Sequence, residues 1–287
     1  MSRIAYVNGR YVPHRDARVH VEDRGFQFSD AVYEVVAVKE GVFVDEALHL
    51  ARLHRSLAEL RIAPPMSDAA LATVLREVVR RNGVGEGIVY LQVSRGAAPR
   101  DFAFPSDASP SLVVTARRKG LSDPRLLADG VGVITIPDIR WARPDIKSVS
   151  LLPNVLGKQQ AKDRGAFEAW QIDADGCVTE GTSSNAWIVA GAGEIVTRPA
   201  NNSILNGVTR QGVLDLIARQ GLKLSERRFS LAEAKEAPEA FLTSASNFII
   251  PVVRIDGAAV GEGRPGPVTR RLAAAYAAYA TAGGRAQ

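Results

Sequence analysis

Apolar residues recur along the first 117 positions with two spacings, the alternation of strands and the three-to-four spacing of helices. Asn8-Gly9 between apolar runs is a strong hairpin signal, and Ser67 is a favourable N-cap residue. The predicted elements are a hairpin in 4–12, two strands in 31–44 that turn at Glu40-Gly41, helices over 45–60 and 67–82, and strands over 87–96 and 111–117. This part therefore reads as a sheet with two helices.

The second part of the chain again mixes strands and helices. A polar stretch at 118–125, broken by Gly and Pro, is a candidate linker. The predicted elements beyond it are a strand over 130–136, a helix over about 154–164, a hairpin within 166–190, a helix capped by Thr209, strands near 222–228, 239–243 and 249–255, and a final helix over 266–282. We expect an α+β fold with a smaller N-terminal domain (1–118), a linker (119–124) and a larger C-terminal domain (125–287).

Composition excludes several classes of protein. The chain has 287 residues, of which 46% are hydrophobic and 23% charged, as in soluble globular proteins. The N-terminus lacks the apolar stretch of a secretory signal, and no run approaches the ~18 apolar residues of a membrane span. A single cysteine, Cys177, rules out an intrachain disulfide, so a cytoplasmic location is expected. The net charge is +5, but basic residues are interleaved with acids and lack stacking aromatics, so nucleic-acid binding is not expected.

One lysine stands among apolar and small residues. Lys147 follows Ile146, whereas Lys158 and Lys162 fall where a helix would show a polar face. A lysine in apolar surroundings tends to lose its proton because desolvation disfavours the ammonium, and a Schiff base with a carbonyl needs a neutral amine. The alternative is a lysine whose stem lies on the core with its head in water. The local sequence leaves both interpretations open.

Other stretches carry weaker signals. Glu180 ends a strand before a turn rich in Ser and Thr, which could hold it facing a pyridine nitrogen, or it is an exposed strand-end carboxylate. Gly207 and Thr209 open a helix whose free N–H groups suit a phosphate, although nearly every helix has such a start. The stretch 243–247 places small hydroxyl residues after a strand, which suits a phosphate or a plain turn.

Two arginines and two histidines are open to more than one interpretation. Arg52, taken alone, reads as a solvated arginine near Glu46 or Glu59. Arg100, on the loop 95–105, suits capture of a carboxylate, although most loop arginines are merely solvated. No metal site is expected, because His49 and His54 lie five residues apart and do not share a helix face.

Four motifs in order resemble a known family. DRGFQFSDAVYEVV at 23–36, the lysine of DIKS, TEGTSSN at 179–185 and NGVTR at 206–210 resemble the fold-type IV (class IV) pyridoxal phosphate aminotransferases, and among them most of all the D-amino-acid aminotransferases. The resemblance covers essentially the whole chain. It implies a two-domain fold-type IV architecture in which the C-terminal domain binds the cofactor, pyridoxal 5'-phosphate.

The resemblance also implies roles for individual residues. Lys147 would form the Schiff base and move the proton between the substrate α-carbon and the cofactor, and Glu180 would pair with the pyridinium nitrogen. The positions that match the phosphate contacts of the family are Arg52, Val208, Thr209, Ser244 and Ala245. A hydroxyl residue is common at the position of Ala245, so one phosphate hydrogen bond is expected to be lost, with Ser246 as the nearest substitute.

Substrate recognition departs from the family pattern. Tyr33 and Arg100 match two of the three residues that hold the substrate carboxylate in D-amino-acid aminotransferases, but the third, a histidine, is Phe102. Phenylalanine cannot donate a hydrogen bond, which would cost about 1.5–3 kcal/mol, or about ten- to a hundredfold in binding. In this family the arginine loop comes from the neighbouring subunit, which implies a homodimer whose active site that subunit completes.

The expected reaction is transamination of D-amino acids, with D-alanine and 2-oxoglutarate giving pyruvate and D-glutamate. The partners are a small-molecule amino donor and a 2-oxo acid acceptor. Alternatives are an (R)-selective amine aminotransferase, which Phe102 would suit, and a branched-chain L-aminotransferase or aminodeoxychorismate lyase, against which the loop RGAAPRDF argues. A cofactor-binding protein without turnover is a further alternative, against which the joint presence of Lys147, Glu180 and Arg52 argues.

Overall fold

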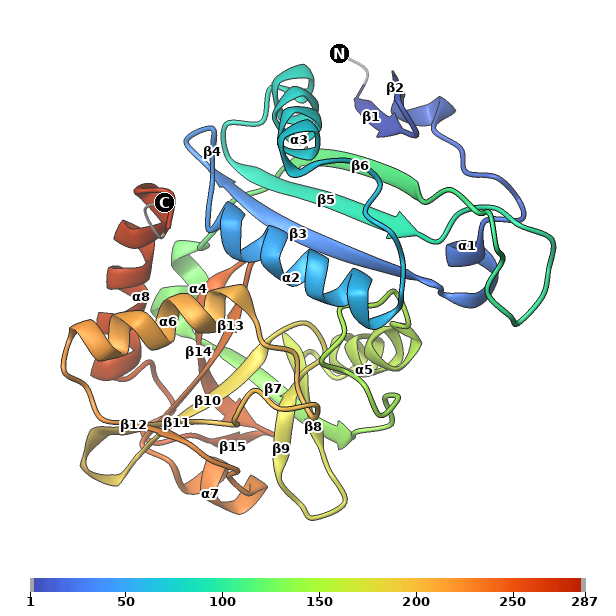
Figure 1. Cartoon of the computed structure of the whole chain (residues 1–287). Helices are drawn as coiled ribbons and strands as arrows, with labels where there is room; N and C mark the ends of the chain where they lie inside the picture. The colour runs from blue at the N-terminus through green and yellow to red at the C-terminus, as the bar shows by residue number, and fades with distance from the viewer. Residues whose placement is uncertain (1–2, 285–287) are drawn as a thin grey trace. The chain divides into compact units, whose positions relative to one another are not determined.

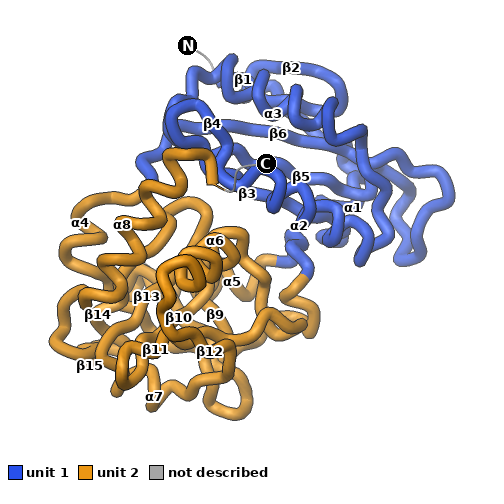
Figure 2. The backbone as a smooth tube through the Cα atoms, turned by 60° about the vertical axis from the view of Figure 1, so that its left-hand side comes forward, with its two compact units in different colours: residues 1–121, 146–150, 286–287 blue, residues 122–145, 151–285 orange. Residues whose placement is uncertain are grey.

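The computed structural model describes residues 3–284. Contacts within the chain divide it into two compact units (Figure 2). Among the described residues, unit 1 holds 3–121 and 146–150, and unit 2 holds 122–145 and 151–284. No helix within these residues is long and apolar enough to cross a membrane.

Unit 1 is built on a six-stranded sheet with the order β2-β1-β6-β5-β3-β4 (Figure 1). All neighbouring strands run antiparallel. The strands are β1 (Ile4–Val7), β2 (Arg10–Pro13), β3 (Ala31–Lys39), β4 (Val42–Phe43), β5 (Gly87–Ser94) and β6 (Ser111–Arg118). The two hairpin turns predicted at Asn8-Gly9 and Glu40-Gly41 are confirmed.

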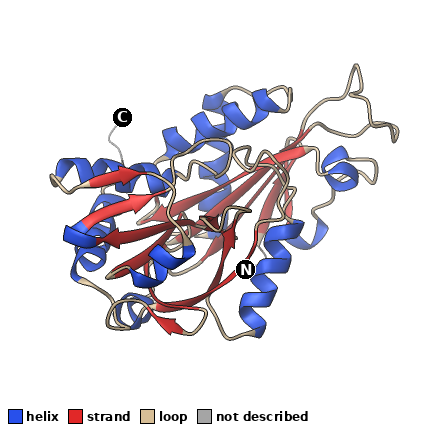
Figure 3. Cartoon of the chain, turned by 90° about the horizontal axis from the view of Figure 1, so that it is seen from below, coloured by secondary structure: helices blue, strands red, loops and turns tan. Residues whose placement is uncertain are grey.

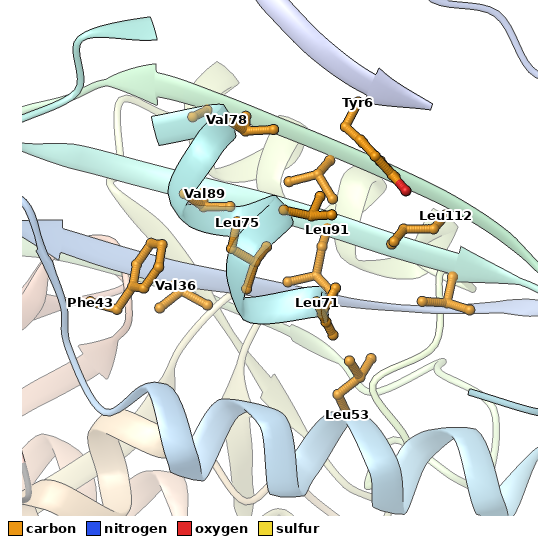
Figure 4. Close-up of a cluster of buried hydrophobic side chains, with 14 of the residues drawn as sticks. Tyr6, Val36, Phe43, Leu53, Leu71, Leu75, Val78, Val89, Leu91 and Leu112 are labelled. Atoms are coloured by element: carbon orange, nitrogen blue, oxygen red, sulfur yellow. The ribbon is translucent and has the colours of Figure 1, made fainter. Parts of the chain in front are cut away.

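Two amphipathic helices cover one face of this sheet. They are α2 (Glu46–Glu59) and α3 (Asp68–Asn82); the shorter α1 (Arg24–Phe28) and a 3₁₀ turn, η1 (His14–Asp16), lie in the connections. Leu53 of α2 and Leu71 and Leu75 of α3 are almost fully buried against Val36 and Leu91 of the sheet (Figure 4). Burying such side chains contributes about 1.5–3 kcal/mol each. The predicted cap is also confirmed, because the Ser67 Oγ accepts a hydrogen bond from the Ala70 N–H at 3.4 Å.

Unit 2 contains a nine-stranded mixed sheet. Its order is β12-β11-β10-β13-β14-β7-β8-β9, with β15 paired to β14. The pairs β7·β8, β7·β14 and β11·β12 are parallel and the others antiparallel. The strands are β7 (Val131–Pro137), β8 (Glu168–Ile172), β9 (Val178–Gly181), β10 (Asn185–Ala190), β11 (Glu194–Thr197), β12 (Leu224–Glu226), β13 (Glu239–Ser244), β14 (Phe248–Ile255) and β15 (Ala258–Ala259).

Unit 2 also contains helices, and Figure 3 shows the helices of the chain in blue and its strands in red. They are α4 (Pro124–Asp129), α5 (Leu152–Asp163), α6 (Val208–Arg219), α7 (Leu231–Glu236) and α8 (Pro267–Thr281), with a 3₁₀ turn η2 (Gly191–Gly193). The core contains Trp170, Ile188, Phe229 and Leu242, none of them more than 1% exposed. The predicted α+β class is therefore confirmed. The short α7 and β11 were not predicted, because each is too brief to show a clear period.

Two local features differ from the expectations. Thr209 does not cap α6: the helix begins at Val208 with Gly207 as its N-cap, so Thr209 lies in the first turn. The segment 146–150 packs with unit 1, although the predicted limits place it in the C-terminal domain. It lies beside the start of β3, because the Tyr33 N–H donates to the Lys147 carbonyl at 3.0 Å. The domain limits themselves stay a prediction.

Candidate active site

Lys147 is fixed by its backbone on both sides. Its carbonyl accepts the Tyr33 N–H, its own N–H donates to the Ser56 Oγ at 3.3 Å, and the next residue, Ser148, forms a bridge with Val32. Ile146, which precedes it, is 4% exposed and belongs to the core of unit 1. The apolar neighbour noted in the sequence is therefore the anchor that holds this segment on β3.

The amine of Lys147 lies on an aromatic surface. Its Nζ is 4.2 Å from the centroid of the Tyr33 ring, and the lysine is half-buried. Tyr33 stacks on Tyr90, with ring centroids 5.7 Å apart, and the Tyr90 hydroxyl donates to the Gln92 Oε1 at 2.6 Å. Burial raises the pKa of Tyr90 to about 12. The structure thus brings Lys147 together with one of the predicted substrate-binding residues, Tyr33.

Arg52 is buried rather than solvated, so that expectation is wrong. Its Nε and Nη2 donate to the two carboxylate oxygens of Glu34, each at 2.7 Å, and the His49 Nδ1 lies 2.7 Å from the Glu34 Oε2. Burial alone would raise the pKa of Glu34, but Arg52 and His49 lower it to about 2. Burial lowers the pKa of His49. The two acids suggested as partners are engaged elsewhere, Glu46 with Arg76 and Glu59 with Arg55.

The loop between β5 and β6 carries the other two predicted substrate residues. Arg100 is exposed, and Phe102 is 84% exposed. The guanidinium of Arg100 lies 4.6 Å from the centroid of the Phe28 ring, and the rings of Phe28 and Phe102 are 5.4 Å apart. The two residues therefore share one aromatic support on α1.

Glu180 is a buried, hydrogen-bonded carboxylate in unit 2. It is 5% exposed, and it forms an ion pair with Arg140. The Asn185 Nδ2 and the Leu205 N–H donate to it at 2.9 and 3.0 Å. Burial raises the pKa of Glu180, against the opposing effect of Arg140. Three donors, from Arg140, Asn185 and the Leu205 backbone, therefore hold this carboxylate.

The hydroxyl residues next to Glu180 do not hold it, contrary to expectation. The Ser183 Oγ donates to the Glu168 Oε2 at 2.8 Å, the Ser184 Oγ does so at 3.2 Å, and Thr182 also binds Glu168. Glu168 is 1% exposed on β8. It organises the turn that leads from Glu180 to Asn185. Sequence reasoning missed it, although a lone acid at the start of an apolar strand was a usable signal.

Arg140 is the second residue that the sequence analysis missed. Its Nε and Nη2 donate to the two oxygens of Asp138 at 2.9 and 2.7 Å, and its Nη1 donates to Glu180. The neighbouring carboxylates raise the pKa of Arg140 against the effect of its burial. The guanidinium is therefore held in place by Asp138 and presents its other edge to Glu180. An acid two residues before an arginine, directly after a strand, was the only local sign.

The start of α6 and the end of β13 carry the predicted phosphate contacts. No side chain caps α6. A Cβ on Gly207 would lie 2.2 Å from the Asn185 Oδ1, so this close approach requires glycine. The Oγ of Ser244 is buried and has no hydrogen-bond partner within the described part of the chain. Val208 and Thr209 are buried in the first turn, and Ala245 follows Ser244 in a half-buried turn.

Each unit, taken by itself, carries groups that fit parts of pyridoxal phosphate. In unit 1 the half-buried amine of Lys147 suits an aldehyde, and the guanidinium of Arg52 suits a phosphate. In unit 2 the buried carboxylate of Glu180 suits a pyridinium, and the uncapped start of α6 and the orphaned hydroxyl of Ser244 suit a phosphate. Across residues 3–284 no cluster of three or more His, Cys, Asp or Glu side chains could hold a metal ion.

Comparisons with known proteins agree with this chemistry. The family model "Amino-transferase class IV" matches residues 31–255. The chain is 43% identical over 266 residues to a D-alanine aminotransferase of Bacillus licheniformis, covering 92% of this chain and 93% of that one. It is 37% identical over 277 residues to a D-alanine aminotransferase of Staphylococcus haemolyticus, covering 96% of each.

Solved structures show the same fold. A branched-chain amino acid aminotransferase of Escherichia coli is similar with a TM-score of 0.92 and 26% identity, covering 100% of this chain and 97% of that one. A second branched-chain amino acid aminotransferase, complexed with N-(5'-phosphopyridoxyl)-L-glutamate, gives a TM-score of 0.89 and 26% identity, covering 98% and 95%. The chain therefore belongs to the class IV aminotransferases and is a pyridoxal phosphate-dependent aminotransferase of fold type IV.

Proposed function

We propose that the chain transaminates D-amino acids, with D-alanine as donor and 2-oxoglutarate as acceptor. The observation that carries this proposal is its similarity over nearly the whole chain to proteins named D-alanine aminotransferase, at 43% identity over 92% of its length. Identity to the branched-chain enzymes of the same fold is lower, at 26%. The D-amino-acid reaction is therefore favoured over the branched-chain alternative.

Lys147 is the proposed catalytic residue. Pyridoxal phosphate, when bound, supplies an aldehyde for the amino groups and a ring that accepts the electrons of the α-carbon. Lys147 would bind the aldehyde through its Nζ and, once displaced by the substrate amine, take the proton from the substrate α-carbon. The hydrogen bonds of the Lys147 backbone to Tyr33 and Ser56 would keep its amine near the cofactor after the substrate has displaced it from the aldehyde.

The proposed cofactor contacts divide between a carboxylate and several donors. Glu180 would keep the ring nitrogen protonated, with Arg140 and Asn185 fixing its two oxygens. The phosphate would be bound by the residues named from the family resemblance: Arg52, Val208, Thr209, Ser244 and Ala245. The buried, unpartnered Oγ of Ser244 supports this assignment, because a buried hydroxyl otherwise costs free energy.

We propose that the substrate carboxylate is held by Tyr33 and by Arg100 of a neighbouring subunit in a homodimer, with Phe102 beside Arg100. Large apolar side chains are exposed around α1 and the Arg100 loop, among them Val21 at 70%, Phe26 at 72% and Phe102 at 84%. Exposed apolar surface of this kind suits a contact with a second copy. A cytoplasmic location stays a prediction.

One feature favours a second candidate, an (R)-selective amine aminotransferase. Phe102 stands where a hydrogen-bond donor to the substrate carboxylate is expected, and its ring is exposed. An apolar side chain at this place would accept a substrate without a carboxylate. Arg100, which remains, argues for a carboxylate substrate.

The test is the visible spectrum of the pyridoxal phosphate-loaded protein, recorded before and after an amino donor is added without a 2-oxo acid. With D-alanine, the absorption of the lysine-bound cofactor should fall, the pyridoxamine phosphate form should rise, and pyruvate should appear. A change with (R)-1-phenylethylamine alone would favour the second candidate, and a change with L-leucine alone would reject both. Lys147→Ala is the control and should lack the lysine-bound absorption.

A further inference from the structure

The Arg100 loop is long and has no regular structure of its own. Residues 95–110 connect β5 to β6 without a helix or strand, apart from one bridge between Ala97 and Asp23. In Figure 1 the loop extends from the end of β5 past α1. A loop of this length needs specific anchors to present a side chain at a fixed place.

Arg24 on α1 is the anchor closest to Arg100 in the loop. It is 3% exposed. Its Nη1 donates to the carbonyl of Asp101 at 2.6 Å, and its Nη2 lies 3.5 Å from the carbonyl of Phe102. These are the two residues that directly follow Arg100. One buried guanidinium therefore fixes the backbone next to the residue proposed to bind the substrate carboxylate.

Asp30 fixes Arg24 in turn. The Arg24 Nε donates to the Asp30 Oδ2 at 2.8 Å, and Arg95 binds the same carboxylate through Nε at 2.7 Å and Nη2 at 3.0 Å. Burial alone would raise the pKa of Asp30, but the two arginines lower it. Arg95 also lies 3.7 Å from the centroid of the Phe104 ring, further along the loop. Two arginines that share one acid thus contact the part of the loop that follows Arg100.

Arg100 itself is left without an acid. Within residues 3–284 it forms no ion pair or hydrogen bond, and its contact is with the face of Phe28. Asp30, the half-buried acid of this cluster, forms ion pairs with Arg24 and Arg95. Arg100 therefore presents an exposed guanidinium, to which an external carboxylate can bind.

We propose that Arg24, tied to Asp30, is a positioning residue that sets where Arg100 presents its guanidinium to the substrate carboxylate. This inference rests on the proposed function. Arg24 would not touch the substrate and would act through the backbone carbonyls of Asp101 and Phe102. Its loss should therefore weaken carboxylate binding more than it slows the chemistry.

The test is a double-mutant cycle on the pyridoxal phosphate-loaded enzyme with D-alanine and 2-oxoglutarate, using Arg24→Ala, Arg100→Ala and the double variant. Arg24→Ala should raise KM for D-alanine ~10-fold or more and change kcat by less than ~3-fold. In the Arg100→Ala background it should have little further effect, because the residue it positions is gone. An equal loss in both backgrounds would overturn the proposal.

A second readout does not depend on activity. Hydrogen exchange of the amides of 99–105, followed by mass spectrometry, should quicken ~10-fold or more in Arg24→Ala, while α3 exchanges as before. Unchanged exchange in the loop would overturn the proposal even if KM rose. Arg24→Lys keeps the charge but not the forked geometry, and it replaces the alanine variant if that variant does not fold. It should show a smaller rise in KM and a smaller increase in the exchange of the loop amides. Arg80→Ala, at an exposed ion pair, is the control.

The two hypotheses can fail separately. If the wild-type protein does not transaminate D-alanine, the proposed function fails, and the exchange of residues 99–105 then decides alone whether Arg24 holds the loop. If the wild type is active and Arg24→Ala keeps its KM, the proposed function stands and the positioning role is rejected.

Discussion

Tyr33 and Glu34 are neighbours in β3 but serve opposite faces of the sheet. Successive side chains of a strand alternate between faces. Tyr33 therefore lies beneath the Nζ of Lys147, while Glu34 points under α2 and binds Arg52. One dipeptide thus supports both the proposed catalytic lysine and the proposed phosphate-binding arginine. A change at Glu34 should act on Arg52 without removing the aromatic surface under Lys147.

Glu34→Gln should destabilise the protein and weaken cofactor binding. The variant removes the buried negative charge that pairs with the guanidinium of Arg52, at a cost of about 3 kcal/mol in unfolding free energy. The pKa of Glu34 is lowered to about 2, so its contribution is present above the ordinary carboxyl pKa near 4.5 and is lost as the pH falls toward 2. Denaturant unfolding at pH 7 and at pH 3 should show a smaller difference between variant and wild type at the lower pH.

The matched control is Glu77→Gln. The pKa of Glu77 is also lowered to about 2, by Arg80 and Arg81, but this ion pair lies at the surface, where the side chain of Arg80 is 71% exposed. Exposed ion pairs contribute little to stability, so this variant should unfold like the wild type. Equal destabilisation by the two substitutions would show that burial of the Glu34 pair is not the cause.

The regular elements could be predicted from the sequence, whereas most ion pairs could not. The periods that give α2 and β3 are local, and both elements are predicted correctly. Glu34 and Arg52, however, are 18 residues apart, and Arg140 and Glu180 are 40 apart, so no sequence spacing joins them. The sequence favours a solvated Arg52 because the acids considered as its partners lie on its own helix.

The site shows the same limit. Family motifs pointed to Lys147 and Glu180, but the association of 146–150 with unit 1 and the partners of Glu180 are consequences of tertiary packing. Glu168 accepts the hydrogen bonds of the hydroxyl residues that the sequence analysis assigned to Glu180. The acid that a turn contacts depends on the order of the strands in the sheet, and local sequence patterns do not reveal that order.

Glu180→Gln should keep the fold and reduce activity. An amide can still accept from Leu205, but it carries no charge with which to keep a pyridine nitrogen protonated. We expect kcat for D-alanine to fall ~100-fold or more, with a smaller change in cofactor affinity. Single-turnover kinetics of the loaded enzyme would measure this fall in rate. Unchanged activity in Glu180→Gln would reject the role given to this carboxylate.

Arg140→Met should instead lower stability, because it removes the ion pair of the buried Glu180.

Ser244→Ala should affect the loaded protein and spare the apoprotein. The buried Oγ has no partner within the described residues, so its removal should leave the melting temperature of the apoprotein unchanged or slightly higher. If this hydroxyl donates to the phosphate, affinity for pyridoxal phosphate should fall ~10-fold. Thermal unfolding with and without cofactor, together with a fluorescence titration, separates the two effects. A loss of stability in the apoprotein and no loss of affinity would show that the hydroxyl is structural.

Phe102→His should raise kcat/KM for D-alanine. An imidazole N–H restores a donor for the substrate carboxylate, which contributes about 1.5–3 kcal/mol, or about ten- to a hundredfold. Because Phe102 is 84% exposed, the replacement should cost little stability, although the contact with Phe28 is altered. Phe102→Ala removes the same ring without adding a donor, so a gain confined to the histidine variant identifies the hydrogen bond as its cause. If both variants match the wild type, Arg100 alone suffices for the carboxylate and the missing donor has no cost.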